Sequence, residues 1–164
     1  MINKILAKKI KEMTDIDQKT RKLYLKEMKN DFLQPLVYCL DIVNNYLIYK
    51  IIKEYGFPNK KNIGVKTLKK FWLLVQHQDL DIKLQKECLK NCNFNLKERA
   101  YLTDRVLVNE GKKQIYGTQF YRSKEKLIPR PIKNKEKMED LRKSADLEPF
   151  SEYESKMSNL LPKK

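Results

Sequence analysis

Apolar residues recur at helical spacing along most of the chain, and the clearest pattern runs from Val65 to Gln76. Its apolar letters widen into an almost unbroken run from Phe71 to Val75, which is typical of a helix covered on most sides. The run finishes in Gln76 and His77, and His77 is the only histidine of the sequence. The pattern therefore predicts a buried helix that carries two polar side chains to the end of the core.

Further helical patterns lie on both sides of this run. The longest begins at Pro35, a residue suited to a first helical turn, and stops at Gly56. Asp15 or Asp17 can cap the second helix of the chain, and Asp79 can cap the helix that follows His77. The remaining patterns cover residues 3–13, 16–29, 80–92, 96–108, 135–145 and 151–160, with residues 161–164 expected to be a frayed tail.

Residues 115–121 and 126–132 alternate between apolar and polar letters. This alternation predicts a β-hairpin across residues 123–125, whose second strand lies at an edge because it contains Pro129 and Pro131. Gly117 falls inside the first stretch, where glycine indicates a bulge or a close backbone approach. The expected fold is mainly α, a single-domain helical bundle (residues 1–164) of about six to eight helices with a small β-hairpin near residues 114–132.

The composition narrows the class of protein. At 164 residues the chain fits one domain, and no apolar run approaches the roughly 20 residues that a membrane span requires. The odd cysteine count and the lack of a secretory leader favour a reduced, cytoplasmic compartment. Cys88 and Cys92 share an apolar stripe with Leu84. Together with His77 they fall short of the four ligands of a zinc site, so core packing is expected, with neither a metal nor a cofactor.

The formal net charge of +15 allows two interpretations. Only six of the 36 basic residues are arginines, and these are scattered, which favours a solvated and compositionally biased surface. The alternative is a module that binds nucleic acid or an acidic protein partner. Its expected contact residues are Lys60, Lys61, Lys66, Lys69 and Lys70.

Several polar residues fall at spacings that bring side chains together on one face. Asp17, Gln18 and Arg21 can share a helical face, and so can the later group of Tyr101, Asp104 and Arg105. Further candidates lie in the first predicted strand or immediately before it. They are Gln114, Tyr116, Thr118 and Gln119.

As a set, these motifs resemble a bacterial family known as domain of unknown function 6624, over about residues 10 to 155. The residues that carry the resemblance are Asp17-Gln18 with Arg21, Gly56-Phe57-Pro58, Gly64, Val75-Gln76-His77, Ala100-Tyr101-Leu102 with Asp104-Arg105, and the run from Gln114 to Gln119. One departure is visible. Where the family pattern has an arginine, then Gly-Leu and a tyrosine, this chain has Arg142, Asp146-Leu147 and Tyr153, which puts the local turn in doubt. The resemblance implies a shared fold and a shared polar set, and no activity.

The polar set supports a pocket that binds a small polar or peptide-like ligand, with turnover of that ligand left open. In an enzyme, His77 would be the general acid or base, and Asp104 or Asp17 would orient it. Arg105 or Arg21 would hold an anionic group, while Gln76, Thr118 and Gln119 would fix the substrate. Two alternatives stand beside this hypothesis. The same side chains could form a satisfied structural network, or the protein could be a non-catalytic subunit of a larger assembly.

Overall fold

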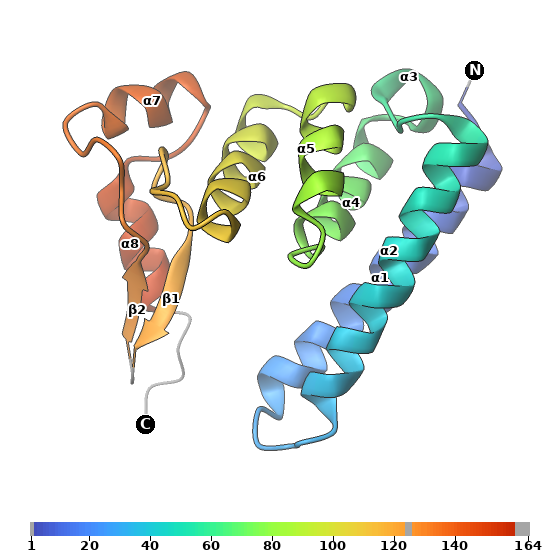
Figure 1. Ribbon diagram of the computed structural model, residues 1–164, viewed down its shortest axis with the longest axis horizontal. Coiled ribbons are helices and arrows are strands. Elements are labelled where there is room, and N and C mark those ends of the chain that lie inside the picture. The colour runs from blue at the N-terminus through green and yellow to red at the C-terminus, as the bar shows by residue number, and fades with distance from the viewer. Residues whose placement is uncertain (1, 124–125, 160–164) are drawn as a thin grey trace. The chain divides into compact units, whose positions relative to one another are not determined.

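The computed structural model describes residues 2–123 and 126–159, which form eight helices and one two-stranded antiparallel hairpin (Figure 1). The mainly helical class predicted from the sequence is confirmed, as is the hairpin. The chain divides into two compact units, Met1–Phe94 (unit 1) and Asn95–Lys164 (unit 2). Among the described helices, none combines the length and the apolar character needed to cross a membrane.

Unit 1 is built from helices alone. They are α1 (Lys4–Lys26), α2 (Leu33–Tyr55), α3 (Lys60–Ile63), α4 (Val65–Gln76) and α5 (Ile82–Asn91). The two long helices, α1 and α2, run antiparallel and pack side by side, and α4 packs against α1 (Figure 1). The chain leaves α2 at Gly56, whose φ of 71° is the left-handed conformation expected of a glycine stop.

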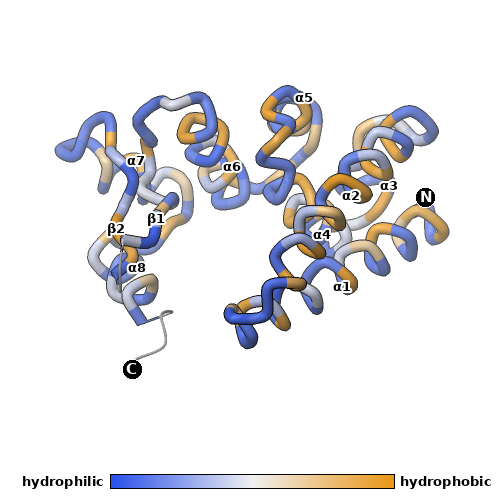
Figure 2. Tube along the Cα trace, turned by 60° about the horizontal axis from the view of Figure 1, so that its bottom comes forward, coloured by the Kyte–Doolittle hydropathy of each residue, from blue (hydrophilic) through white to orange (hydrophobic). Residues whose placement is uncertain are grey.

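Helix α4 forms the centre of the unit 1 core, with the bounds that the apolar pattern predicts. Most of its apolar side chains are buried, among them Leu68, Phe71, Leu74 and Val75. Figure 2 shows the hydrophobic residues along this helix. The hydroxyl of Thr14 on α1 donates to the carbonyl of Lys70, which joins α1 directly to α4. Burial of a continuous apolar face is thus what fixes α4 in place.

The expected break between residues 13 and 16 is wrong, because α1 is one continuous helix. No glycine or proline interrupts this stretch. The two aspartates that could have capped a second helix make other contacts. Asp15 pairs with Lys70 at 2.6 Å, and Asp17 contacts Arg21 on the next turn of the same helix. Without a capping side chain or a helix breaker, the backbone hydrogen bonds simply continue.

The helix after His77 begins later than expected. The carboxylate of Asp81, not that of Asp79, accepts a hydrogen bond from the N–H of Leu84 at 2.9 Å and caps α5. Residues 78–81 therefore form an extra turn between α4 and α5. Cys88 in α5 and Cys92 just after its end are both buried, as the apolar stripe predicts.

Unit 2 combines helices with the hairpin. Its elements are α6 (Leu96–Asn109), β1 (Phe120–Ser123), β2 (Lys126–Pro129), α7 (Met138–Ser144) and α8 (Phe150–Ser158). In the hairpin, Phe120 pairs with Pro129 and Ser123 with Lys126. The predicted turn at residues 124–125 and the predicted helix end and tail at residues 160–164 lie outside the described residues.

The first strand is shorter than predicted because the carboxylate of Asp104 holds the backbone before it. Asp104 accepts hydrogen bonds from the N–H groups of Ile115 at 2.7 Å, Tyr116 at 3.0 Å and Thr118 at 2.9 Å, and from the Thr118 hydroxyl. These bonds curl residues 115–118 around a single buried side chain, so the segment cannot extend as a strand. Gly117 supplies the positive φ of 70° that the curl requires.

A buried arginine joins the curled segment to the C-terminal helices. The guanidinium of Arg142 donates to the carbonyls of Tyr116 at 2.6 Å and Glu148 at 2.8 Å, and it lies over the ring of Tyr153. Asp146, which stands where the family pattern has glycine, adopts a φ of 59°. The turn is therefore kept in a conformation that aspartate tolerates better than most residues do.

We expect Gly117→Ala to lower the free energy of unfolding of unit 2 by about 3 kcal/mol, through backbone strain and crowding combined. A Cβ atom at this position would lie 2.8 Å from the Phe150 ring and 3.0 Å from the sulfur of Met138. Gly111→Ala is the matched control, because Gly111 has a similar φ of 73° with nothing within 4 Å, and it should cost about 1 kcal/mol. Urea denaturation followed by circular dichroism measures both. Equal losses of unfolding free energy in the two variants would show that Phe150 moves and relieves the crowding.

Candidate functional site

The candidate site of unit 1 is centred on His77, the residue at which α4 ends. The backbone N–H of His77 donates to the carbonyl of Leu74, so the imidazole leaves the helix at its last turn. Ring atom Nδ1 lies 2.9 Å from Oδ2 of Asp17 on α1. The ring plane does not aim Nδ1 straight at this oxygen, so the contact is an electrostatic pair and not a linear hydrogen bond.

Asp17 is fully buried and is held from three sides. Besides His77, it accepts hydrogen bonds from Gln18 Nε2 at 2.8 Å and from Arg21 Nε at 3.0 Å. Burial alone raises the pKa of a carboxyl group, because it penalises the charged form. The interactions with His77, Arg21 and Gln18 outweigh that penalty and lower the pKa of Asp17 below its ordinary value of 3.8.

Arg21 also bridges to α2, where its Nη2 pairs with Oδ1 of Asp41. Burial raises the pKa of Asp41 above its ordinary value, and the charge of Arg21 offsets only part of that effect. The two carboxylates on either side of one guanidinium thus have pKa values shifted in opposite directions. Such a pair beside a histidine is a common arrangement at sites that move protons or bind charged ligands, although structural ion pairs show it too.

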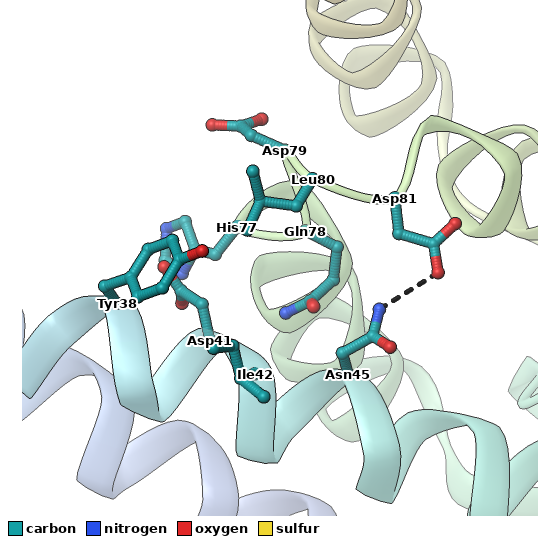
Figure 3. Close-up of a pocket in the computed structure, with 9 residues that line it drawn as sticks. All are labelled: Tyr38, Asp41, Ile42, Asn45, His77, Gln78, Asp79, Leu80 and Asp81. Atoms are coloured by element: carbon teal, nitrogen blue, oxygen red, sulfur yellow. Dashed lines mark hydrogen bonds between the residues drawn. The ribbon is translucent and has the colours of Figure 1, made fainter.

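A pocket of about 420 Å³ opens beside these groups. One wall is a single face of α2, because its lining positions follow helical spacing, and the other wall is the turn after α4 (Figure 3). Tyr38, Asp41 and His77 lie on the same side of the pocket in Figure 3. The lining residues are Tyr38, Asp41, Ile42, Asn45, His77, Gln78, Asp79, Leu80 and Asp81.

Asp81 fixes the far wall of the pocket. Its Oδ2 accepts hydrogen bonds from Asn45 Nδ2 at 3.1 Å and from the hydroxyl of Tyr49 at 2.9 Å, while its Oδ1 caps α5. Partial burial opposes ionisation of Asp81, but these hydrogen bonds lower its pKa. Burial and the bond to Asp81 raise the pKa of Tyr49 to about 12. The start of α5 is thereby anchored to α2 across the pocket.

Three metal-ligating side chains meet at this site. The carboxylates of Asp17 and Asp41 and the imidazole of His77 place ligand atoms within 4.8 Å of one another. However, the guanidinium of Arg21 already bridges the two carboxylates and supplies a positive charge there. A divalent ion would have to displace it, so the donor set as arranged fits an ion-paired network better than a metal centre.

Four residues predicted as site residues belong to unit 1. Gln18, Arg21 and His77 lie together, because each of them contacts the carboxylate of Asp17. Gln76 is buried next to His77, and its carbonyl accepts a hydrogen bond from Gln85. Of the two aspartates expected to orient His77, Asp17 is the one that contacts it within unit 1.

The other predicted site residues belong to unit 2, where they contact residues of the same unit. Tyr116 and Thr118 are held by Asp104, as described above. The buried side chain of Gln114 donates to the carbonyls of Gln119 at 3.0 Å and Arg130 at 2.7 Å. The carbonyl of Tyr101 accepts a hydrogen bond from Gln119 Nε2, its ring meets that of Tyr153 edge to face, and Arg105 lies half-buried on α6.

Of the nine residues that line the pocket, only His77 was among the predicted site residues. Tyr38 and Asp41 lie within the apolar pattern that predicts α2, and Asp81 follows Asp79, the residue that was expected to cap the next helix. A usable signal existed for Asp41, because Asp41 and Asn45 stand four residues apart in an otherwise apolar helix and buried polar groups need partners. Their partners, Arg21 and Asp81, could not be identified from spacing, because they lie on other helices.

We expect Asp17→Asn to destabilise unit 1 by about 3 kcal/mol at pH 7, because the variant leaves Arg21 and His77 beside a neutral amide. The lowered pKa of Asp17 means that its stabilisation is complete above about pH 4 and is lost as the pH falls through the folded-state pKa. The difference in unfolding free energy between wild type and variant should therefore shrink below pH 4. Fluorescence of Trp72, the only tryptophan and a buried residue of α4, reports unfolding of unit 1.

Asp31→Asn provides the control for this measurement, because Asp31 is exposed in the connection between α1 and α2. It should leave the pH dependence of unfolding unchanged. A difference between wild type and Asp17→Asn that stays constant down to pH 2 would contradict the ion-pair account.

Comparison with known proteins places this arrangement in a family without assigning it an activity. No curated protein and no solved structure matches the chain. A family model described as a family of unknown function (DUF6624) matches residues 5–161, which cover most of both units and every residue of the site described above. The chain therefore belongs to this family of unknown function, DUF6624.

Proposed function

We propose that the pocket beside His77 binds a small polar or peptide-like ligand and that His77 acts there as an acid or base. The observation that carries the proposal is the contact of 2.9 Å between Nδ1 of His77 and the fully buried carboxylate of Asp17, at the edge of a pocket of about 420 Å³. A histidine oriented by a buried carboxylate is a recurring device for proton transfer. The volume lies within the range of small-molecule sites.

The geometry gives each group a distinct role. Nδ1 of His77 lies against the carboxylate of Asp17, which leaves Nε2 as the ring atom that exchanges a proton with a ligand in the pocket. Asp17 takes the orienting role in this proposal, because the carboxylate of Asp104 is already occupied by backbone N–H groups of unit 2. Asn45 and Gln78 line the pocket and add amide groups that can bind a polar ligand.

The test is a thermal-shift screen with amino-acid amides and dipeptides. We expect at least one compound to raise the melting temperature of the wild type, since binding to the folded state stabilises it. His77→Ala should weaken binding of that compound about tenfold or more, because a charge-assisted or polar contact is lost. His77→Asn is the matched variant, because it keeps a polar amide near Asp17 while the group corresponding to Nε2 is absent.

Both variants should remain folded by circular dichroism. A compound that stabilises wild type and both variants equally would place its binding elsewhere. A panel with no stabilising compound would remove the support for a ligand pocket of this class.

A second candidate function has its own observation. Lysines from α1 and α4 line a groove of about 380 Å³ that comprises Ala7, Lys8, Lys11, Lys66, Thr67 and Lys70. Three further lysines of α3 and α4, Lys60, Lys61 and Lys69, are exposed. This surface suits nucleic acid or an acidic protein partner, although ion pairs of Lys70 with Asp15 and of Lys8 with Glu12 reduce its charge.

Binding through this surface would be strongly salt-dependent. With a short single-stranded DNA as probe, we expect affinity to fall at least tenfold between 50 and 200 mM salt if several phosphates are neutralised. Charge reversal at Lys61, Lys66 and Lys69 should abolish binding, whereas reversal at Lys83 and Lys90 on α5 should have a smaller effect. Affinity that is insensitive to salt would reject this candidate.

A further inference from the structure

We infer that the ligand of the His77 pocket carries a positively charged amine or guanidinium group beside a short apolar portion. This inference rests on the proposed function, because it names the class of ligand for the same pocket. It is carried by the charge of the lining residues, by the free side of Asp41 and by the apolar surface next to it.

The pocket has the opposite charge to the protein. The whole chain has 36 lysines and arginines against 21 acidic residues. Among the nine described residues that line the pocket, three are aspartates and none is a lysine or an arginine (Figure 3). A concave site lined by one sign of charge attracts ligands of the other sign. The local excess of carboxylates therefore favours a cation.

The ion pairs next to the pocket also carry unequal numbers of positive and negative charges. Asp17 and Asp41 share the single guanidinium of Arg21, so with a neutral His77 imidazole the two carboxylates carry one more negative charge than Arg21 neutralises. Asp17 is fully buried, whereas the side chain of Asp41 is 20% exposed and lines the pocket. A ligand that supplies the second positive charge must therefore meet Asp41.

Asp41 has an oxygen to offer such a ligand. Arg21 contacts Oδ1, and within the described part of the chain Oδ2 of Asp41 makes no hydrogen bond. Burial keeps the pKa of Asp41 above its ordinary value, which a nearby cation would reverse. One turn before Asp41 on α2, the half-exposed ring of Tyr38 lines the same side of the pocket (Figure 3). Aromatic faces attract ammonium and guanidinium groups.

The remaining lining favours an organic cation over a metal ion. Ile42 and Leu80 are both exposed large apolar residues and both line the pocket. A hydrated divalent ion gains nothing from such surface, since it binds through several oxygen ligands. An alkyl chain attached to an amine would cover both side chains while its charged end reaches Asp41 and Tyr38.

Three probes of equal chain length test the inference on the full-length protein. Pentylamine, 1-pentanol and pentanoate are cationic, neutral and anionic at pH 7, and titrations followed by NMR report binding through the side-chain amides of Asn45 and Gln78. We expect pentylamine to bind at least tenfold more tightly than pentanoate, with 1-pentanol in between. Asp41→Asn should weaken pentylamine binding about tenfold and leave 1-pentanol binding unchanged.

Two further variants keep the test decisive. Tyr38→Leu keeps an apolar side chain and should weaken pentylamine binding about threefold without affecting 1-pentanol, which tests the inference even if Asp41→Asn is unstable. Asp31→Asn, which removes the same charge from an exposed position outside the pocket, should change neither affinity.

The outcomes separate this inference from the function on which it rests. Equal affinity for the three probes would overturn the cationic ligand and leave a ligand pocket standing. Binding of ZnCl₂, but not of pentylamine, at the same amides would replace the organic cation by a metal and overturn the inference. If none of the probes perturbs these amides, both the inference and the proposed pocket fail.

Discussion

The structure of unit 1 depends on how it accommodates the buried charge of Asp17. A carboxylate removed from water is costly unless hydrogen bonds and opposite charges compensate it. Gln18 and Arg21 compensate it from its own helix, and His77 does so from the end of α4. Because the compensation comes from two helices, the same contacts that stabilise the fold also fix the orientation of the imidazole. The contacts of Asp17 therefore serve both the stability of unit 1 and the candidate site.

Unit 2 uses a buried aspartate for a different purpose. Asp104 accepts hydrogen bonds from backbone N–H groups and from the Thr118 hydroxyl, which carry no charge, whereas Asp17 contacts the guanidinium of Arg21 and the imidazole of His77. A carboxylate held by amides organises a loop, as the curled segment before β1 shows. A carboxylate held by a histidine and an arginine can also respond to protons and ligands. This contrast is why the pocket of unit 1 is the stronger candidate for function.

Much of the fold could be predicted from the sequence, because local signals dominate there. Apolar periodicity gave the bounds of α4, and the glycine stop gave the end of α2. Errors arose where a tertiary contact competed with a local one. From the sequence, Asp15 and Asp17 resemble capping residues, but in the structure they pair with Lys70 and His77. His77 could be identified because it is unique, but the wall formed by Tyr38 and Asp41 depends on how α2 packs, which spacing alone does not reveal.

Asp146 holds a backbone conformation in the turn between α7 and α8 that glycine adopts more readily. Its φ of 59° matches what a glycine would adopt at the same turn. Since an aspartate codon becomes a glycine codon when only its second base changes, the two residues can interchange in a single mutational step. One base substitution in the Asp146 codon can therefore install glycine while the path of the chain from α7 to α8 is kept.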